Sequence, residues 1–257
     1  MTSYRPVNAL LRGLDVLRAL NSLKGQATVG KLHQATTLDK ATIVRMLETL
    51  EHEGYVFRDR HTRLYHVTGK ALMLSSGYKR QRVVGIQVQP ILEEFRDQVG
   101  WPSDVAILED DAMMLLETSR EAGPMQLNRS PGYRAPILGT SLGLAYLAYA
   151  DRSEQKKVLK MQAEQPGLWN EIAHDLTLAE KTFEDIRTMG YAVMHPAYSH
   201  LEYQGKISSI GVPIGKAGAV KGAINVLYLK ATLSSTEAQE KLLIPLQKAA
   251  NKMVDFL

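Results

Sequence analysis

The clearest pattern of apolar and polar positions lies between Thr28 and Tyr55, in the segment TVGKLHQATTLDKATIVRMLETLEHEGY. Apolar residues recur there at intervals of three and four, which predicts two helices joined by a tight turn. The second helix is expected to begin after Asp39 and to end at Gly54, since Asp is common at helix N-termini and Gly at helix C-termini. Its apolar side comprises Ile43, Met46, Leu47 and Leu50.

The opposite side of this second helix carries small, hydroxyl and cationic groups near its N-terminus. Ala41, Arg45, Glu48 and His52 lie on it, and Lys40 and Thr42 lie in the first turn. Such groups suit contact with phosphates and base edges in a DNA major groove. The candidate DNA contacts are therefore Lys40, Thr42 and Arg45. A helical hairpin with a solvated face is the alternative interpretation of this stretch.

A helix and a hairpin flank the helix pair. Residues 7–22 predict a helix with an apolar stripe at Leu10, Leu11, Leu14 and Leu17. Thr28 is expected to cap the helix that follows Gly25. After Gly54, residues 55–57 and 64–67 favour strands around a charged tip, residues 58–63. Three helices and a hairpin predict a winged helix-turn-helix, whose wing would set Arg58, Arg60 or Arg63 against the DNA backbone or in the minor groove.

Residues 68–82 predict a short helix and a basic linker ending in Lys79-Arg-Gln-Arg82. Residues 84–99 have apolar positions at helical spacing, and Pro90 is expected to kink this linker helix or to lie in its first turn. The domain boundary is placed at Arg82. The chain is thus expected to consist of domain 1–82 and domain 83–257.

The second part shows a different periodicity. Strands are predicted at residues 103–110, 112–120, 134–138, 191–195, 206–214 and 220–230, with turns at 110–111, 123–124, 131–132 and 216–219. Helices are predicted at residues 141–150, 153–165, 177–189 and 234–257. Capping boxes are expected at Thr177-Leu-Ala-Glu180 and Ser234-Ser-Thr-Glu237, and Gly190 is expected to end the third helix. The pattern predicts an α+β domain with helices packed on an antiparallel sheet.

Composition and charge narrow the function. The 257 residues include no Cys, which excludes disulfides, thiolate metal sites and cysteine nucleophiles. The net charge of +4 divides into +8 over residues 1–82 and −4 over the remainder. A basic first part indicates a polyanionic partner, and nucleic acid fits better than a membrane surface. No apolar run is long enough to span a membrane, and the N-terminus lacks a signal peptide, so a cytoplasmic protein is expected.

Four segments resemble the IclR family of transcriptional regulators: residues 39–56 in the first part, and residues 134–148, 186–193 and 205–226 in the second. The resemblance covers nearly the whole chain. It implies a winged helix-turn-helix, a linker helix and a GAF-like effector domain. It also implies a homodimer or a dimer of dimers on a palindromic DNA operator, and it admits RNA polymerase as a further partner. Neither enzymatic activity nor a cofactor is expected.

The resemblance also places the effector site. It implies ligand contacts at the backbone N–H groups of Ser141 and Leu142, and at Met194 or His195, Ser208, Asn225 and Leu227. The N–H groups would open a helix, where a carboxylate is attracted. Further candidates are Trp101, Tyr133 and Arg134, as aromatic walls and a cation. Residues 101–120 are similar to family members that control hydroxyphenylpropionate catabolism, which implies an aromatic carboxylic acid. One departure is the pair Gly143-Leu144, where the family often has Gly-Lys.

Three alternatives remain. Gly139-Thr-Ser-Leu-Gly143 is a G-x-S-x-G sequence, and Asp175 and His195 follow in an order that a hydrolase with Ser141 as nucleophile could use. Alternating βα units and a glycine-rich oxyanion loop do not precede it. The second alternative is a metal site at His195, His200 and Glu202. These residues are close in sequence but lack the spacing of zinc motifs. The third alternative is a regulator whose second domain only oligomerises.

Overall fold

The computed structural model describes residues 5–75, 79–119 and 129–257, and the side chains of residues 75–82 are not described. The predicted turn at Gly123-Pro124 and the basic side chains of Lys79–Arg82 therefore lie outside the described part. The chain divides into two compact units, Met1–Lys79 and Arg80–Leu257. Each unit is described by itself.

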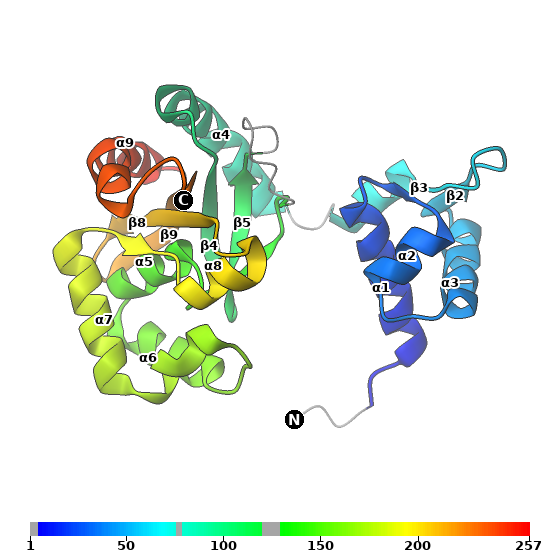
Figure 1. Ribbon diagram of the computed structural model, residues 1–257, viewed down its shortest axis with the longest axis horizontal. Helices are drawn as coiled ribbons and strands as arrows, with labels where there is room; N and C mark the ends of the chain where they lie inside the picture. The colour runs from blue at the N-terminus through cyan, green and yellow to red at the C-terminus, as the bar shows by residue number, and fades with distance from the viewer. Residues whose placement is uncertain (1–4, 76–78, 120–128) are drawn as a thin grey trace. The chain divides into compact units, whose positions relative to one another are not determined.

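The first unit packs three helices against a small sheet (Figure 1). Its elements are α1 (Asn8–Ser22), β1 (Gln26–Ala27), α2 (Val29–Ala35), α3 (Lys40–His52), β2 (Val56–Arg58), β3 (Tyr65–Val67) and the 3-10 helix η1 (Gly69–Ser75). The strands are antiparallel in the order β1-β3-β2. The core joins Leu20 of α1, Leu32 of α2 and Leu47 of α3, all fully buried. This is the predicted winged helix-turn-helix, with a third strand that the sequence pattern did not indicate.

The predicted helix boundaries in this unit are confirmed by their caps. The Thr28 side chain accepts a hydrogen bond from the Lys31 N–H, and the Asp39 side chain accepts one from the Thr42 N–H. Gly54 adopts a φ of 74°, a left-handed conformation that glycine tolerates best, and turns the chain from α3 into β2.

The predicted apolar stripe of α1 is only partly confirmed. Leu17 is buried, but Leu10, Leu11 and Leu14 are 62%, 45% and 45% exposed. The residues of α1 that reach the core are Val16, Leu17, Ala19 and Leu20. The first two turns of the helix thus carry apolar residues that the described elements of this unit leave exposed.

The second unit is built around a six-stranded antiparallel sheet in the order β6-β5-β4-β9-β8-β7. The strands are β4 (Ser103–Glu109), β5 (Ala112–Thr118), β6 (Arg134–Pro136), β7 (Ala192–Val193), β8 (Ile207–Lys216) and β9 (Ala219–Leu229). The helices are α4 (Lys79–Val99), α5 (Ser141–Tyr149), α6 (Arg152–Gln162), η2 (Leu168–His174), α7 (Leu176–Met189), α8 (Pro196–Tyr203) and α9 (Ser235–Met253). The predicted α+β fold is confirmed.

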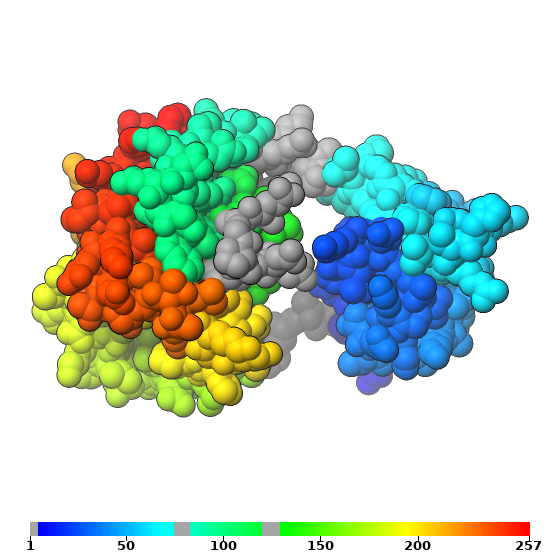
Figure 2. Space-filling model, turned by 45° about the horizontal axis from the view of Figure 1, so that its top comes forward, coloured from blue at the N-terminus to red at the C-terminus, as the bar shows by residue number. Residues whose placement is uncertain are grey.

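Helices cover both faces of this sheet (Figure 1). Along β9, Ile224 and Val226 pack in a cluster with α4 and α9, whereas Ala223 and Leu227 belong to clusters on the face of α5 and α8. This alternation follows from the two-residue period of a strand. Figure 2 shows α4 and α9 side by side on the surface of the unit, and Lys252 of α9 binds the Glu94 carboxylate of α4 at 2.7 Å.

Several local predictions for this unit are confirmed and two are wrong. Gly190 ends α7 with a φ of 78°, and Ser234 forms the expected capping box with Glu237. The cap of α7 is Asp175, not Thr177, because the Asp175 carboxylate accepts hydrogen bonds from two backbone N–H groups of the first turn. The strand predicted for residues 191–195 contains only Ala192–Val193.

The chain after β7 forms the short helix α8, which the sequence pattern did not indicate. The His195 side chain caps its N-terminus, where Nδ1 accepts a hydrogen bond from the Ala197 N–H at 3.2 Å. Pro90 lies inside α4, which continues through it. Among the described residues, no helix is both long and apolar enough to cross a membrane.

Candidate functional site

The N-terminus of α3 is held by one side chain. Asp39 accepts hydrogen bonds from the Thr42 N–H at 2.9 Å and from the Thr42 hydroxyl at 2.7 Å. These bonds lower the pKa of Asp39, so the cap is ionised at neutral pH. Because the Thr42 hydroxyl donates its proton to Asp39, it has only its methyl group and its oxygen lone pairs left for contacts with DNA.

The two cationic candidates of α3 lie on its outer surface. Lys40 and Arg45 are exposed, while Ile43 and Leu47 on the opposite side are fully buried. Burial of these two apolar residues fixes the rotation of the helix about its axis. The first two turns of α3 therefore present their cations to solvent, where a DNA major groove could accept them.

The wing has a tip ordered by its own carboxylate. Asp59 accepts hydrogen bonds from the His61 N–H at 2.8 Å and from the Thr62 hydroxyl at 2.6 Å. Arg60 and Arg63 are exposed at this tip, which projects from the first unit in Figure 1. The Asp59 bonds shape the turn, so both cations extend from a defined loop.

Arg58 differs from the other two arginines of the wing. Its guanidinium lies 5.5 Å from the centre of the Tyr65 ring, and its backbone N–H donates to the Glu51 carboxylate at 3.2 Å. Such a cation–π contact orients the side chain along the hairpin. Arg58 thus links the wing to the end of α3, where Glu51 lies.

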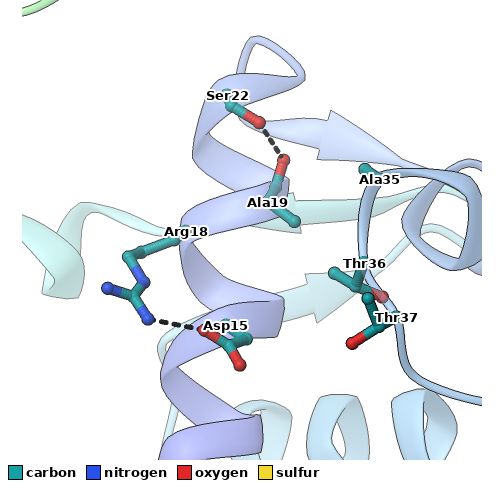
Figure 3. A pocket seen from close by; sticks show the side chains of 7 residues that line it. All are labelled: Asp15, Arg18, Ala19, Ser22, Ala35, Thr36 and Thr37. Carbon is teal, nitrogen blue, oxygen red and sulfur yellow. Dashed lines mark hydrogen bonds and ion pairs between the residues drawn. The ribbon is translucent and has the colours of Figure 1, made fainter. Parts of the chain in front are cut away.

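A shallow groove of about 430 Å³ lies between α1 and the turn that joins α2 to α3 (Figure 3). Four of its polar side chains are bound to one another or to the backbone. Arg18 pairs with Asp15, Ser22 donates to the Ala19 carbonyl, and Thr36 donates to the Leu32 carbonyl. These groups stabilise the helix pair, and we assign no ligand to the groove.

In the second unit, the G-x-S-x-G segment packs α5 closely against its neighbours. A β-carbon on Gly143 would overlap the carbonyl group of Ile137, and a β-carbon on Gly211 would lie 2.5 Å from the Ser141 carbonyl oxygen. Both glycines are therefore needed for the close approach of α5 to the chain before it and to β8. The spacing of glycines in this segment has a packing role.

The residues of the hydrolase alternative are separately engaged. The Ser141 hydroxyl is buried and hydrogen-bonded to the Ser209 hydroxyl at 2.6 Å. Asp175 caps α7, and His195 caps α8. Burial lowers the pKa of His195, although the carboxylate of Glu171 opposes this effect. A nucleophile needs a base within hydrogen-bond reach, and the Ser141 hydroxyl is paired with another hydroxyl.

The backbone at the N-terminus of α5 lies against strand β8. Thr140 caps the helix by accepting from the Gly143 N–H at 3.2 Å. The backbone N–H groups of Ser141 and Leu142 belong to the first turn, which has no carbonyl partners within the helix. Two backbone hydrogen bonds hold the chain between β7 and α8 in place. The His195 N–H donates to the Gly139 carbonyl, and the Met194 N–H donates to the Ser209 carbonyl.

On the same face of the sheet lies a buried ion pair. Arg129 donates from Nη1 to the Asp104 carboxylate at 2.7 Å, and their side chains are 5% and 0% exposed. The other carboxylate oxygen of Asp104 accepts from the Thr118 hydroxyl at 2.5 Å, and the Asp104 N–H donates to the Asn225 side chain at 3.0 Å. Burial disfavours the charge of Arg129, but Asp104 and neighbouring tyrosines outweigh this effect and raise its pKa.

Tyrosines surround this cation. The Arg129 guanidinium lies 5.6 Å from the Tyr133 ring and 5.5 Å from the Tyr203 ring. The hydroxyls of Tyr133 and Tyr198 are 3.5 Å apart, and Tyr198 meets Trp169 edge to face at 5.4 Å. We name Arg129, Asp104, Tyr133, Tyr198 and Tyr203 the tyrosine–arginine cluster. It combines a buried cation with aromatic walls.

Comparison with known proteins decides the family. Residues 9–60 match the family model described as "IclR helix-turn-helix domain". Residues 78–254 match the family model described as "Bacterial transcriptional regulator IclR C-terminal". The chain belongs to the IclR family. The family assignment makes it an IclR-type transcriptional regulator with a DNA-binding helix-turn-helix, and its homologues are regulators rather than enzymes.

Three relatives illustrate the similarity. The Pca regulon regulatory protein of Pseudomonas putida is 27% identical over 96% of this chain and 82% of its own length. An IclR transcriptional regulator from Alicyclobacillus acidocaldarius has a TM-score of 0.64 at 24% identity, covering 98% of this chain and 99% of its own. An IclR homologue from Microbacterium hydrocarbonoxydans, complexed with 4-hydroxybenzoate, has a TM-score of 0.63 at 20% identity, covering 97% and 98%.

Within this IclR-type second unit, some expected ligand residues lie together. Met194 and Leu227 form one buried cluster with Tyr198 and Ile207. Tyr133 and Asn225 each contact a member of the Arg129–Asp104 pair. Ser141 and Leu142 lie at the N-terminus of α5, and His195 lies at that of α8. The two helix ends are connected by the hydrogen bond from the His195 N–H to the Gly139 carbonyl.

Three other expected ligand residues lie elsewhere. Trp101 packs against the cluster of α4 and α9, on the opposite face of the sheet. Arg134 is 41% exposed and binds Glu109 and Asp111 at 2.7 and 2.6 Å, at the turn of the β4–β5 hairpin. Ser208 is paired with Tyr228, which faces α4 and α9, so its neighbour Ser209 is the serine that faces α5.

Arg129 and Asp104 are not among the ligand residues predicted from the sequence. Asp104 offers a sequence indication, because an acidic residue in the apolar run DVAIL must find a partner if the strand is buried. Arg129 stands in a polar loop, and nothing in its neighbourhood indicates burial. Its partner is 25 residues away, so only the fold shows the pair.

The metal alternative gains no support from the geometry. His195 caps α8, whereas His200 and Glu202 lie exposed along the same helix. Among the described residues, no group of three or more His, Asp or Glu side chains is arranged to hold a metal ion.

Proposed function

We propose that this regulator binds a palindromic operator through residues 1–82 and senses an aromatic carboxylic acid through residues 83–257. Lys40 and Arg45 on α3 contact base edges or phosphates in the major groove, and Arg60 and Arg63 of the wing contact the backbone or the minor groove. The observation that supports this half is the capped helix α3, whose cations are exposed while its apolar side is buried.

The operator is read by a homodimer, or by a dimer of dimers. Exposed Leu10, Leu11 and Leu14 on α1 support self-association, because apolar side chains gathered on one helix favour a protein partner. A two-fold dimer would place two copies of α3 on two half-sites, which accounts for a palindrome. The protein acts in the cytoplasm, where its DNA is, and RNA polymerase is a further partner at the promoter.

The effector is an aromatic acid of a catabolic pathway, and 3-(3-hydroxyphenyl)propionate is one candidate. The observation that supports this half is the tyrosine–arginine cluster, which places a buried cation among aromatic rings. The complex of the Microbacterium hydrocarbonoxydans homologue with 4-hydroxybenzoate supports the same class of ligand. Ser141 and Leu142 offer backbone N–H groups, and Met194 and Leu227 offer apolar contacts.

Thermal unfolding of the full chain with a panel of acids tests this proposal. The panel contains hydroxylated phenylpropionates, benzoates including 4-hydroxybenzoate, cinnamates and short oxo acids. A dose-dependent rise in Tm with one aromatic class is expected, because a ligand that binds only the folded state stabilises it. A rise only with short oxo acids would overturn the aromatic assignment. No rise with any acid would leave the second unit as an oligomerisation domain.

A further inference from the structure

Arg129 has a hydrogen-bonding capacity that its own ion pair does not use. Nη1 binds Asp104, but Nη2 is buried and has no hydrogen-bond partner among the described residues. A buried donor on a charged group without an acceptor is costly. The side chain is nevertheless 95% buried, so its position needs a further explanation.

The arrangement of Asp104 fixes the direction of the free donor. One carboxylate oxygen accepts from Thr118 and the other accepts from Nη1 of Arg129. Each oxygen of the Asp104 carboxylate thus has one donor, and the carboxylate holds the guanidinium by one nitrogen. The second nitrogen is left for an acceptor that comes from outside the pair.

The tyrosines supply a second donor and an apolar wall. The hydroxyls of Tyr133 and Tyr198 are 3.5 Å apart, so one hydroxyl can donate to the other and a proton remains for a third group. Burial raises the pKa of Tyr198, which keeps its hydroxyl protonated. The rings of Tyr198 and Tyr203, 6.2 Å apart and nearly perpendicular, offer faces and edges to an aromatic ligand.

We propose that Arg129 is the residue that recognises the carboxylate of the effector. Nη2 donates to one carboxylate oxygen, the tyrosine hydroxyl pair donates to the other, and the ring of the acid packs among Tyr198, Tyr203 and Trp169. This assignment rests on the proposed function, and it moves the carboxylate-binding role from the Ser141 and Leu142 N–H groups and from Arg134 to Arg129. Asp104 is a positioning residue, since it touches only the guanidinium and its own neighbours.

The test compares an acid with its neutral amide. Binding of 4-hydroxybenzoate, 4-hydroxybenzamide, 3-(3-hydroxyphenyl)propionate and its amide is measured by calorimetry on the full chain. The wild type is expected to prefer the acid of its effector class by at least ~10-fold, since charge-assisted hydrogen bonds are the strong ones. Arg129→Lys keeps the charge beside Asp104 but replaces the two terminal nitrogens of the guanidinium with a single nitrogen, which cannot occupy the positions of Nη1 and Nη2 together. This change should lower the affinity for the acid at least ~10-fold and leave that for the amide nearly unchanged.

The matched control is Arg134→Lys. Arg134 is an exposed arginine of the same unit with two carboxylate partners, so this change should leave the acid-to-amide ratio as in the wild type. Two further variants guard against misfolding at position 129. Arg129→Gln with Asp104→Asn removes both buried charges together, and Tyr133→Phe removes one hydroxyl from a half-buried residue. Both are expected to lose preference for the acid.

The outcomes separate this inference from the proposed function. Acid binding with an unchanged acid-to-amide ratio in Arg129→Lys and Tyr133→Phe would overturn the role of the cluster and leave the proposed function intact. Loss of the ratio in Arg134→Lys would also overturn it. Absence of binding of any panel acid to the wild type would overturn the proposed effector class, and the inference with it.

Discussion

The carbonyl oxygen of Ser141 lies 2.5 Å from the position that a β-carbon on Gly211 would occupy. The first turn of α5 is thus seated directly on the backbone of β8. The same turn carries the Ser141 and Leu142 N–H groups and the Ser141–Ser209 hydrogen bond. Gly211 therefore sets the distance between the helix N-terminus and the sheet at the proposed effector site.

Replacing Gly211 by Ala should destabilise the second unit by about 1–3 kcal/mol, because the new methyl group meets backbone atoms that cannot move independently. Urea unfolding followed by tryptophan fluorescence measures this, since both tryptophans, Trp101 and Trp169, lie in the second unit. Gly139→Ala is the control. Its methyl group would meet the Trp169 side chain at 3.2 Å rather than backbone atoms, so it should destabilise the unit less than Gly211→Ala. An equal effect of both changes would contradict the seating of α5.

Arg45→Ala should weaken binding to a specific operator by about 1–3 kcal/mol without altering the fold, if its guanidinium reads a base edge. The operator is first obtained by selection from randomised duplex DNA, and affinity is then measured by fluorescence anisotropy. Arg152→Ala, at an exposed cation of α6, is the matched control. Wild-type affinity in Arg45→Ala would refute the assignment of α3.

The wing arginines should act differently from Arg45. Arg60→Ala with Arg63→Ala is expected to weaken binding to all sequences similarly and to reduce the dependence of log K on log salt by about 1–2 units, as loss of one or two phosphate contacts would. Asp59→Ala leaves both cations but removes the bonds that order the tip, so it should weaken binding less. An unchanged salt dependence in the double variant would exclude phosphate contacts by the wing.

His195 should make the stability of the second unit pH-dependent. Burial lowers its pKa below the ordinary value of 6.5, and its neutral Nδ1 caps α8. As the pH falls below 6.5, the unfolded chain takes up the proton first, so stability present at higher pH is lost toward the lowered pKa. His195→Asn keeps a capping side chain that does not titrate. The loss of unfolding free energy between pH 7.5 and 5.5 should therefore be smaller in this variant, and an equal loss would contradict the assignment.

Much of the first unit follows from local sequence. Asp39, Gly54 and the charged hairpin tip each act within a few residues, so their chemistry is visible in the chain. The exposed leucines of α1 do not follow from local sequence in the same way. Periodicity indicates an apolar face, but the number of turns that the other helices cover is a tertiary property.

In the second unit, local sequence does not distinguish between neighbouring residues that could take the same role. Asp175 and Thr177 both satisfy the sequence rules for a helix cap. In the structure, Asp175 is the residue that accepts hydrogen bonds from the first turn of α7. Ser208 and Ser209 are adjacent, and which one faces α5 depends on the register of β8 with β9. The pairing of Arg129 with Asp104 joins a loop to a strand, so local spacing carries no trace of it.

We expect an aromatic acid bound by the second unit to change operator binding by the first. The direct test is the affinity of the full chain for its selected operator, measured with and without a saturating concentration of the acid that raises its Tm. The expected change in affinity is at least about 5-fold, the lower end of typical allosteric couplings. An unchanged affinity with the acid fully bound would contradict it.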